Sequence, residues 1–332
     1  MTKRKDMVAK RREVLVGRKL VKHKENRNEN LGVSDLFDHE GVLSNDLKSI
    51  GVTGGYYHFI SCDSTNNILK KVSHGILQLD YQTNGSHLKP PSSIENLEDW
   101  LLQWLARAAL PCVITASEQT AGRGRHSNTW WTGTGSLALS MLLDAKQHGL
   151  EPQTSAQLSL VIGYAAMQAL RTIMAETALE SGTVTIPNVE IRWPNDVYVN
   201  DCKMTGILIE MPNTHHVIIG VGINTNNSVV DAPEELRNKV VTLSDVMGQK
   251  IDQDRLIFLL CREIMEILFN FPLHLPQVIE KVEANLYQTG KMVNIASGSE
   301  QISGKCLGLN PNGSLRVLTE TGEKAVVSGV TV

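Results

Sequence analysis

Short apolar runs and longer amphipathic segments follow one another along this chain, and their order predicts a mixed α and β fold. A run of about four to eight apolar residues has the length of a buried strand, whereas apolar residues spaced three or four apart over a longer stretch mark one face of a helix. Cys112-Val113-Ile114 and the run from Leu137 to Leu143 are of the first kind. The pattern predicts strands over residues 56–61, 112–114, 137–143, 191–193, 197–199, 203–210 and 217–221, and helices over 66–72, 97–110, 154–174, 252–271 and 275–287.

Shifts in composition divide the chain into three predicted parts. Residues 1–50 are expected to form a basic, flexible segment, because Lys, Arg, Asn and Glu dominate positions 1–30. Residues 51–272 carry the strand and helix pattern, with a stretch rich in Gly, Ser, Asn and Pro at 74–92 that predicts an exposed loop. Residues 285–332 contain short alternating runs separated by glycines, which predicts a small β-barrel domain.

The overall composition is that of a soluble globular protein. The chain has 332 residues, of which 42% are hydrophobic and 20% are charged, enough for about two domains. The net charge of −3 gives no general attraction to nucleic acids or anionic membranes, and no apolar run reaches the roughly 18 residues that span a bilayer. We expect the basic segment to be a solvated tail, with nucleic-acid contact or an organelle address as alternatives.

The cysteines indicate the compartment. All five are scattered along the chain without Cys-x-x-Cys spacing, which argues against a zinc site or a disulfide framework. Free thiols are typical of a reducing environment. We therefore expect a cytoplasmic protein.

The loop between the strands at 112–114 and 137–143 carries the chemistry. It contains Gly122-Arg123-Gly124-Arg125, followed by Trp130-Trp131. If this segment is extended, the two arginines point to the same side and converge on one target. Guanidinium groups and the bare amides of glycine suit carboxylate and phosphate oxygens, so the loop predicts an anion site. An exposed turn with two core tryptophans is the alternative that the loop by itself leaves open.

Further polar positions stand at the ends of predicted strands. Ser64 and Thr65 follow the first strand, where they could cap the next helix or line a pocket. Lys203 lies where a hairpin turn meets a buried strand, and it either extends along the surface or points at a ligand. Asn224 follows the strand at 217–221 and could form a turn or bind a base edge.

Taken in order, these motifs resemble those of the biotin–protein ligases. The resemblance covers the chain from about Gly51 to its end. It implies an α+β fold, with a mixed sheet and packed helices similar to class II aminoacyl-tRNA synthetases, followed by a small SH3-like β-barrel. The matching motifs are Ser64-Thr65-Asn66, Gln119 to Arg125 with Trp130, Trp193-Pro194-Asn195-Asp196, Lys203 in KMTGILIE, and Gly220 to Asn224.

The resemblance also implies a two-step reaction that uses ATP, biotin and Mg²⁺. The carboxylate of biotin attacks the α-phosphate of ATP to give biotinoyl-AMP and pyrophosphate. A lysine on the biotin carboxyl carrier domain of a biotin-dependent carboxylase then attacks that anhydride. Arg123, Arg125 and Lys203 can supply the positive charge that the first step needs, together with Mg²⁺ bridging the phosphates. No protein residues are assigned as metal ligands, no membrane or nucleic-acid partner is expected, and the oligomeric state is left open.

Residue roles are carried over only at matching positions. Ser64, Thr65 and Gln119 would hydrogen-bond the ureido ring of biotin, and the loop of Gly122, Arg123, Gly124 and Arg125 would close over biotin and its adenylate. Trp130 would cover the adenylate, Asn224 would bind the adenine, and Asp196 would help the acceptor lysine lose its proton. Asn66, Arg192, Asn195, Lys203 and Gly206 complete the expected binding set, and Lys203, Arg123, Arg125 and Asp196 form the catalytic one.

The chain departs from the family pattern at several positions. Arg192 stands where the family usually has Lys before Trp-Pro-Asn-Asp, and the two cations are not equivalent at a phosphate. His126-Ser127 stands where the family often has glycine, which predicts a stiffer loop. Residues 1–50 are too short and too polar for the DNA-binding winged helix of the longer ligases, so no repressor module is expected.

Two other functions fit the same residues less well. A lipoate–protein ligase shares the fold and the adenylation chemistry, but its Arg-Arg-x-x-Gly-Gly-Gly motif and His-Asp pair do not occur here. The other alternative is a ligand-binding regulator without catalysis. If such a regulator contacted nucleic acid through the basic segment, its binding would weaken steeply with salt.

Overall fold

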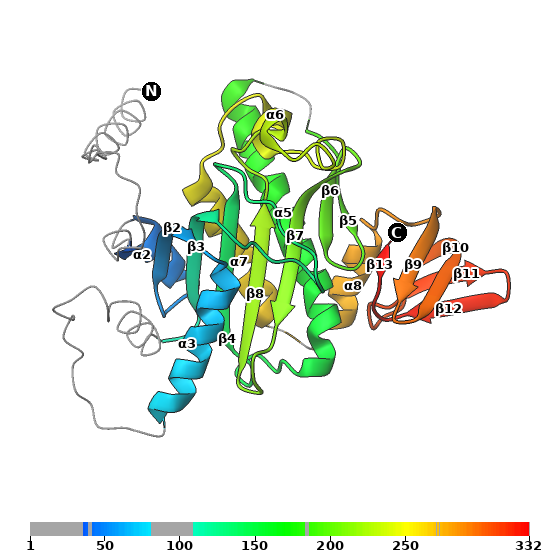
Figure 1. Ribbon diagram of the computed structural model, residues 1–332, viewed down its shortest axis with the longest axis horizontal. Helices are drawn as coiled ribbons and strands as arrows, with labels where there is room; N and C mark the ends of the chain where they lie inside the picture. Colours follow the sequence, from blue (N-terminus) through cyan, green and yellow to red (C-terminus); the bar gives the residue numbers. More distant parts are fainter. Residues whose placement is uncertain are drawn as a thin grey trace. The chain divides into compact units, whose positions relative to one another are not determined.

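The computed structural model describes residues 36–38, 42–80, 109–182, 186–269, 271 and 273–331 (Figure 1). These residues form one eight-stranded sheet with packed helices and a second, five-stranded sheet. The basic stretch at 1–30 lies outside them, as does the helix predicted over 97–110 except for its last two positions.

The main sheet is mixed, in the order β1-β2-β3-β4-β8-β7-β6-β5. β2 and β3 run parallel, and the other neighbours are antiparallel. The apolar run predicted at 137–143 is buried at every position, because helices and loops cover β4 on both faces. The strands are β1 (Leu36–Asp38), β2 (Tyr56–Cys62), β3 (Cys112–Gln119), β4 (Leu137–Asp144), β5 (Val189–Arg192), β6 (Asp196–Val199), β7 (Cys202–Glu210) and β8 (His216–Ile223).

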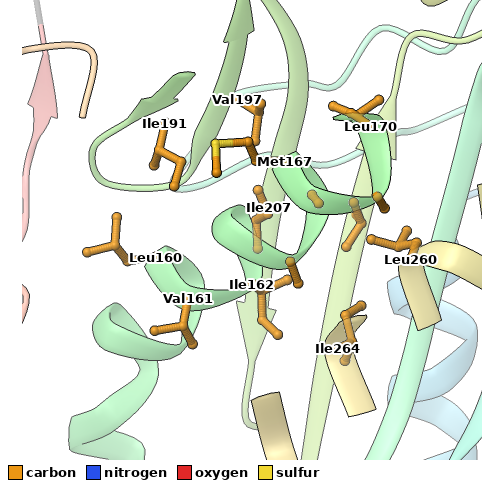
Figure 2. Packing of buried hydrophobic residues seen from close by; sticks show 14 of the residues in the cluster. Leu160, Val161, Ile162, Met167, Leu170, Ile191, Val197, Ile207, Leu260 and Ile264 are labelled. Atoms are coloured by element: carbon orange, nitrogen blue, oxygen red, sulfur yellow. The ribbon is translucent and has the colours of Figure 1, made fainter. Parts of the chain in front are cut away.

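Helix α5 (Ser155–Ser181) packs between the main sheet and α7 (Gln253–Phe269). Figure 2 shows its side chains between Ile207 of β7 and Leu260 of α7. The pattern predicted one apolar face, but all six residues from Leu158 to Gly163 are buried, because the sheet and α7 cover opposite sides of the helix. Pro152–Ser181 is long and apolar enough to cross a membrane, yet 72% of that apolar window is buried inside the protein, so core packing accounts for its composition.

Helix α3 (Thr65–Asp80) is longer than the helix predicted at 66–72 and includes the first part of the loop predicted at 74–92. Tertiary packing holds this continuation in helical form despite Gly75. Ser73 is fully buried, and its hydroxyl lies 3.0 Å from Nδ1 of His216, within hydrogen-bond distance. Ile76 then packs on a cluster of buried residues that includes Leu69 and Val72. Residues 81–92 of the predicted loop lie outside the described residues.

The main body begins before residue 51, where the predicted boundary stood. β1 pairs with β2, and α2 (Val42–Ser49) packs against α7. Leu43 and Leu47 are four residues apart on one face of α2, and Leu47 is only 1% exposed in the main core. This short amphipathic helix is therefore part of the folded body.

The predicted small β domain is an antiparallel sheet in the order β12-β11-β10-β9-β13. Helix α8 (Leu275–Glu283) precedes it, and Ile279 and Val282 of that helix share one continuous core with Ile295 and Val317 of the sheet. The expected α+β fold is thus confirmed. The strands are β9 (Met292–Ser297), β10 (Glu300–Leu309), β11 (Leu315–Thr319), β12 (Gly322–Val326) and β13 (Val330–Thr331). A further short helix in the main body is α6 (Leu243–Met247).

Candidate active site

One cavity of about 300 Å³ gathers residues from distant parts of the chain. Its wall comes from the loop between β3 and β4 (residues 120–136, the Gly-Arg loop), the start of α3, the turn between β5 and β6, and parts of β7 and β8. Gly329 and Val330 of the C-terminal sheet also line it. The predicted site residues in this wall are Ser64, Thr65, Asn66, Gln119, Arg123, Gly124, Arg125, Trp130, Arg192, Asn195, Asp196, Lys203 and Gly206.

The start of α3 forms a hydrogen-bonded end of the cavity. The Thr65 N–H and hydroxyl donate to Oε1 of Gln119 at 2.9 and 3.2 Å. The Ser140 hydroxyl lies 2.7 Å from Oγ1 of Thr65 and 2.6 Å from Oδ1 of Asn66. Thr65 and Asn66 are each 3% exposed, so a ligand would meet polar groups that are already held in place.

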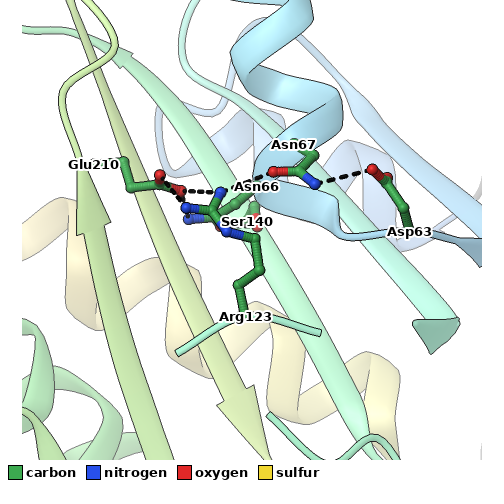
Figure 3. A network of polar contacts seen from close by, with 6 residues as sticks. All are labelled: Asp63, Asn66, Asn67, Arg123, Ser140 and Glu210. Carbon is green, nitrogen blue, oxygen red and sulfur yellow. Dashed lines mark hydrogen bonds and ion pairs between the residues drawn. The ribbon is translucent and has the colours of Figure 1, made fainter. Parts of the chain in front are cut away.

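Arg123 is bound to groups of the protein itself (Figure 3). Its Nη2 and Nη1 donate to Oε1 and Oε2 of Glu210 at 2.8 and 3.1 Å, and Nη1 also donates to Oδ1 of Asn67 at 2.7 Å. Nδ2 of Asn66 donates to the same Glu210 carboxylate at 2.9 Å. The guanidinium is therefore neutralised by a two-point ion pair.

Arg125 contacts a different set of partners. Its Nη1 donates to the Gly329 carbonyl at 3.2 Å and lies 3.5 Å from Oδ1 of Asn195. Desolvation by burial lowers the pKa of Arg125, and the nearby Asp196 carboxylate opposes that shift.

The two arginines do not converge on one target, in contrast to the prediction for an extended segment. The chain turns after Arg123, where the Asn128 N–H donates to the Arg125 carbonyl at 3.1 Å. His126 within this turn has a φ of 56°, a left-handed conformation that glycine adopts at lower cost. The turn sends the second guanidinium to Asn195 and Gly329 instead.

Trp130 lies against two glycines of the sheet. Gly206 of β7 and Gly222 of β8 face each other in register. A Cβ at Gly222 would lie 2.5 Å from Cε2 of Trp130, and one at Gly206 would lie 3.0 Å from Cζ3. The indole therefore occupies space that any larger residue would fill, and its Nε1 is buried without a hydrogen-bond partner among the described residues.

Lys203 and Asp196 form a charged corner of the cavity. Nζ of Lys203 lies 2.8 Å from Oδ1 of Asp196, and the side chains are 29% and 19% exposed, although the contact lacks hydrogen-bond geometry. The ammonium also lies 5.6 Å from the centroid of the Trp130 ring. Oδ1 of Asp196 is itself buried, but both side chains are partly exposed and line the cavity.

Arg192 lines the cavity beside two tyrosines. Its guanidinium donates to the Tyr198 hydroxyl and lies 4.9 Å from the centroid of the Tyr198 ring and 6.0 Å from that of Tyr287. Burial raises the pKa of Tyr198 and Arg192 opposes that shift, so the phenol is neutral at physiological pH. A planar guanidinium stacks on aromatic rings in a way that an ammonium cannot, which fits Arg rather than Lys at this position.

Comparison with known proteins identifies the family. Residues 91–224 match the biotin/lipoate A/B protein ligase family, and residues 289–330 match the biotin protein ligase C terminal domain. The chain belongs to the biotin–protein ligase family.

Curated relatives and a solved structure cover different shares of this biotin–protein ligase family member. The bifunctional ligase/repressor BirA of Bacillus subtilis is 31% identical over 224 residues, which are 65% of this chain and 64% of that protein. The biotin–[acetyl-CoA-carboxylase] ligase of Mycobacterium tuberculosis is 27% identical over 271 residues, 74% of this chain and 96% of that one. The biotin protein ligase from Aquifex aeolicus in complex with biotin and ATP is 27% identical, with a TM-score of 0.62, and the alignment covers 83% of this chain and 97% of that one.

Two predicted residues of this ligase-family chain do not line the cavity. Asn224 is 1% exposed, and its Oδ1 accepts a hydrogen bond from Nδ2 of Asn227 at 3.2 Å. Gly122 packs against the second arm of the Gly-Arg loop, where its carbonyl accepts from the Trp130 N–H at 2.9 Å. Their expected ligand contacts stay predictions.

Several residues at the site were missed by sequence reasoning. Ser140 and Glu210 organise the polar end, and each gave a weak signal as a polar residue within or at the end of an apolar strand. Gly222 was part of a quoted motif, but its role under Trp130 was not predicted. Gly329 gave no signal, because only the packing of the C-terminal sheet brings its carbonyl to Arg125.

Proposed function

We propose that this protein activates biotin with ATP to biotinoyl-5′-AMP and transfers the biotinoyl group to a specific lysine of a biotin carboxyl carrier domain. The observation that carries the proposal is one cavity in which a fixed polar end, the guanidinium of Arg125 and a Lys–Asp corner lie together. The similarity to the Aquifex aeolicus enzyme over 97% of that chain supports it. The chain spans only 64% of the Bacillus subtilis relative, so functions of the uncovered part of that protein are not carried over.

We assign the polar end to the ureido ring of biotin. That ring offers one carbonyl acceptor and two N–H donors. Thr65 and Gln119 are already hydrogen-bonded to each other, and Ser64 is 2% exposed beside them, so the site is preorganised for a ligand with matched donors and acceptors. The apolar part of biotin would extend from this end toward Gly206, and Trp130 would cover the adenylate beyond it.

We assign the first chemical step to the cationic side of the cavity. A carboxylate attacking a phosphate brings anionic oxygens together, and fixed positive charge stabilises the transition state. Arg125 and Lys203 face this side of the cavity. Asp196 is the only carboxylate among the described residues of the wall, so the donor set fits Mg²⁺ held mainly by the phosphates of ATP and not by a protein cage. When bound there, Mg²⁺ would neutralise phosphate charge.

We assign Asp196 to the second step. The acceptor lysine has an ordinary pKa of about 10.4 and must lose a proton before its amine attacks the anhydride. The Asp196 carboxylate is partly exposed at the cavity and can accept a hydrogen bond from the incoming ammonium. Nζ of Lys203, 2.8 Å from Oδ1 of Asp196, orients that carboxylate.

The domain assignment and the compartment are also proposals. We assign biotin activation to residues 51–272 together with the preceding β1 and α2, and we assign residues 285–332 to a C-terminal domain that completes the cavity. All five cysteines are free, and Cys112 and Cys261 are fully buried, which supports a cytoplasmic enzyme.

Mass spectrometry of an acceptor domain tests the proposal. A biotin carboxyl carrier domain is incubated with the purified protein, ATP, Mg²⁺ and biotin, with lipoate replacing biotin in a parallel reaction. We expect one acceptor lysine to gain the mass of biotin, and we expect Lys203→Ala to abolish that gain. The matched control is Lys305→Ala, because Lys305 lies on β10 and outside the wall of the cavity.

Other results of this experiment would contradict the proposed function or the role of Lys203. A mass gain with lipoate alone would assign the chain to the lipoate-type branch. No gain with either acid would indicate a ligand-binding protein without catalysis. Biotin transfer that survives in Lys203→Ala would remove Lys203 from the catalytic set.

A further inference from the structure

We propose that Glu210 is a positioning residue that holds Arg123, and through it the Gly-Arg loop, over the cavity. The ion pair joins a loop to a rigid strand. Glu210 is the last residue of β7 and pairs in register with Ile218 of β8, whereas Arg123 belongs to the Gly-Arg loop. The strand therefore fixes the loop, and the consequence for biotin rests on the proposed function.

The geometry of the Arg123–Glu210 ion pair is that of a strong interaction. Two separate N–H···O contacts of 2.8 and 3.1 Å join the guanidinium to both carboxylate oxygens. The Glu210 side chain is 16% exposed and that of Arg123 is 36% exposed, so water competes only in part. Fork-to-fork pairs of this kind fix orientation as well as distance. The additional contact of Arg123 with Asn67 at 2.7 Å anchors the same guanidinium to α3.

A continuous chain of polar contacts within hydrogen-bond distance connects this ion pair to a second point on the loop. From Glu210 it passes through Asn66, Ser140, Thr65 and Gln119, and it ends where Nε2 of Gln119 donates to Oγ1 of Thr132 at 3.3 Å. Arg123 and Thr132 lie on either side of Arg125 and Trp130 in the sequence. The loop is thus held at both flanks of Arg125 and Trp130, which line the cavity.

The Arg123–Glu210 ion pair gives the two loop arginines different roles. Arg123 is neutralised by a carboxylate, whereas no ion pair among the described residues involves Arg125. Arg125 is consequently the loop cation available to anionic oxygens of a ligand. Arg123 acts through position, and Glu210 is the residue that sets that position.

Trypsin cleavage of the ligand-free full-length protein tests whether the Arg123–Glu210 ion pair holds the loop, and it requires no ligase chemistry. Trypsin cuts after Arg125 only when the loop opens, and local opening rates follow the contacts that hold a segment. Glu210→Gln keeps the side-chain shape and an acceptor for Asn66 but removes the charge. We expect roughly tenfold faster cleavage after Arg125, because hydrogen bonds to charged groups are the stronger ones. The matched control is Glu176→Gln, which breaks the 2.6 Å ion pair with Arg255, outside the cavity wall, and which we expect to leave this cleavage unchanged.

A double-mutant cycle on adenylate retention tests the functional consequence. We expect Glu210→Gln and Arg123→Gln each to raise the KM for biotin and to speed the release of biotinoyl-AMP by roughly tenfold, with a smaller change in kcat. The double variant should be no worse than either single variant, because both remove the same interaction.

The outcomes separate this inference from the proposed function. Equal cleavage after Arg125 in the wild type and Glu210→Gln would overturn the inference, whatever the ligase assay gives. Additive effects on adenylate release would also overturn it, since the two residues would then act independently. Faster cleavage of Glu210→Gln, together with a wild type that transfers no biotin, would support the positioning role of Glu210 and contradict the proposed ligase activity.

Discussion

The pair of glycines beneath Trp130 shows how a missing side chain can shape a site. Gly206 and Gly222 lie opposite each other on neighbouring strands, and together they leave a flat area on this face of the sheet. The Trp130 indole fills that area and lines the cavity. Aromatic rings bind flat ligands by stacking, so the placement of this ring decides which ligands the cavity admits.

Gly222→Ala should therefore damage binding more than stability. The new Cβ would lie 2.5 Å from Cε2 of Trp130, closer than carbon atoms pack, so the indole must move. We expect the KM for ATP to rise by roughly tenfold, because the displacement affects the adenylate side of the cavity. Biotin-dependent ATP–pyrophosphate exchange measures it. An unchanged KM in a folded variant would show that the ring position is unimportant.

Asp196→Asn separates the two half-reactions at a single residue. The amide keeps the shape of the side chain but cannot take up a proton or hold Lys203 by charge. With biotinoyl-AMP supplied, we expect transfer to the acceptor lysine to slow by roughly a hundredfold, the range of a lost general base. Single-turnover transfer to the carrier domain measures this rate. Transfer at the wild-type rate would remove Asp196 from the second step.

At the scale of elements, α5 determines how rigid the floor of the site is. Strand β7 carries Lys203 and Gly206 on the cavity side, and Ile207 points the other way, toward Gly163 of α5. The helix is covered by the sheet on one side and by α7 on the other, so it has little freedom to shift. Because β7 packs on this helix, the positions of Lys203 and Gly206 on that strand are also fixed.

Two substitutions on α5 should have opposite effects on stability. A Cβ at Gly163 would meet nothing closer than 3.8 Å, so Gly163→Ala should raise the free energy of unfolding by roughly 0.5–1 kcal/mol through helix propensity. Leu170 is fully buried on the same helix, so Leu170→Ala should lower the free energy of unfolding by roughly 2–5 kcal/mol. Urea titration followed by circular dichroism measures both. A lower free energy of unfolding for Gly163→Ala would show that the new methyl group does not fit between α5 and Ile207.

At the scale of the whole molecule, the C-terminal sheet domain contributes to the wall of the cavity. Gln288 is 3% exposed, and its amide accepts from the Trp193 N–H at 3.0 Å and donates to the Trp193 carbonyl at 2.8 Å. The Trp193 indole in turn donates to the Gly313 carbonyl at 3.2 Å. Trp193 lines the cavity, so these bonds connect the C-terminal domain to the site itself.

Gln288→Ala tests this connection. It removes both partners of the Trp193 peptide groups in a buried environment, and each unpaired group costs roughly 1–3 kcal/mol. We expect the free energy of unfolding to fall by roughly 2–4 kcal/mol, together with a higher KM for biotin. The matched control is Gln301→Ala on the exposed face of β10, which should change neither quantity. Equal stability of the two variants would show that the Gln288 bonds are dispensable.

The sequence by itself determined the strands of the core, the small C-terminal β domain and many of the residues that line the cavity. Apolar runs such as 137–143 can be buried only as strands at that length, and this information is local. The ordered motifs from Ser64 to Lys203 identified the family because each combines residue type with spacing. The pattern failed where packing outweighs local preference, as at Gly75, which lies within α3, and at Leu47, which joins the core from the segment expected to be flexible.

Only the tertiary structure decided which partner each polar side chain has. Arg123 and Glu210 are 87 residues apart, and Arg125 and Gly329 are 204 residues apart, so no local pattern links them. The two arginines are equivalent by sequence, yet one is neutralised by a carboxylate and the other reaches a carbonyl of the C-terminal domain. Hydrogen bonds and ion pairs act over about 3 Å, and the distances that permit them are set by the packing of the whole chain.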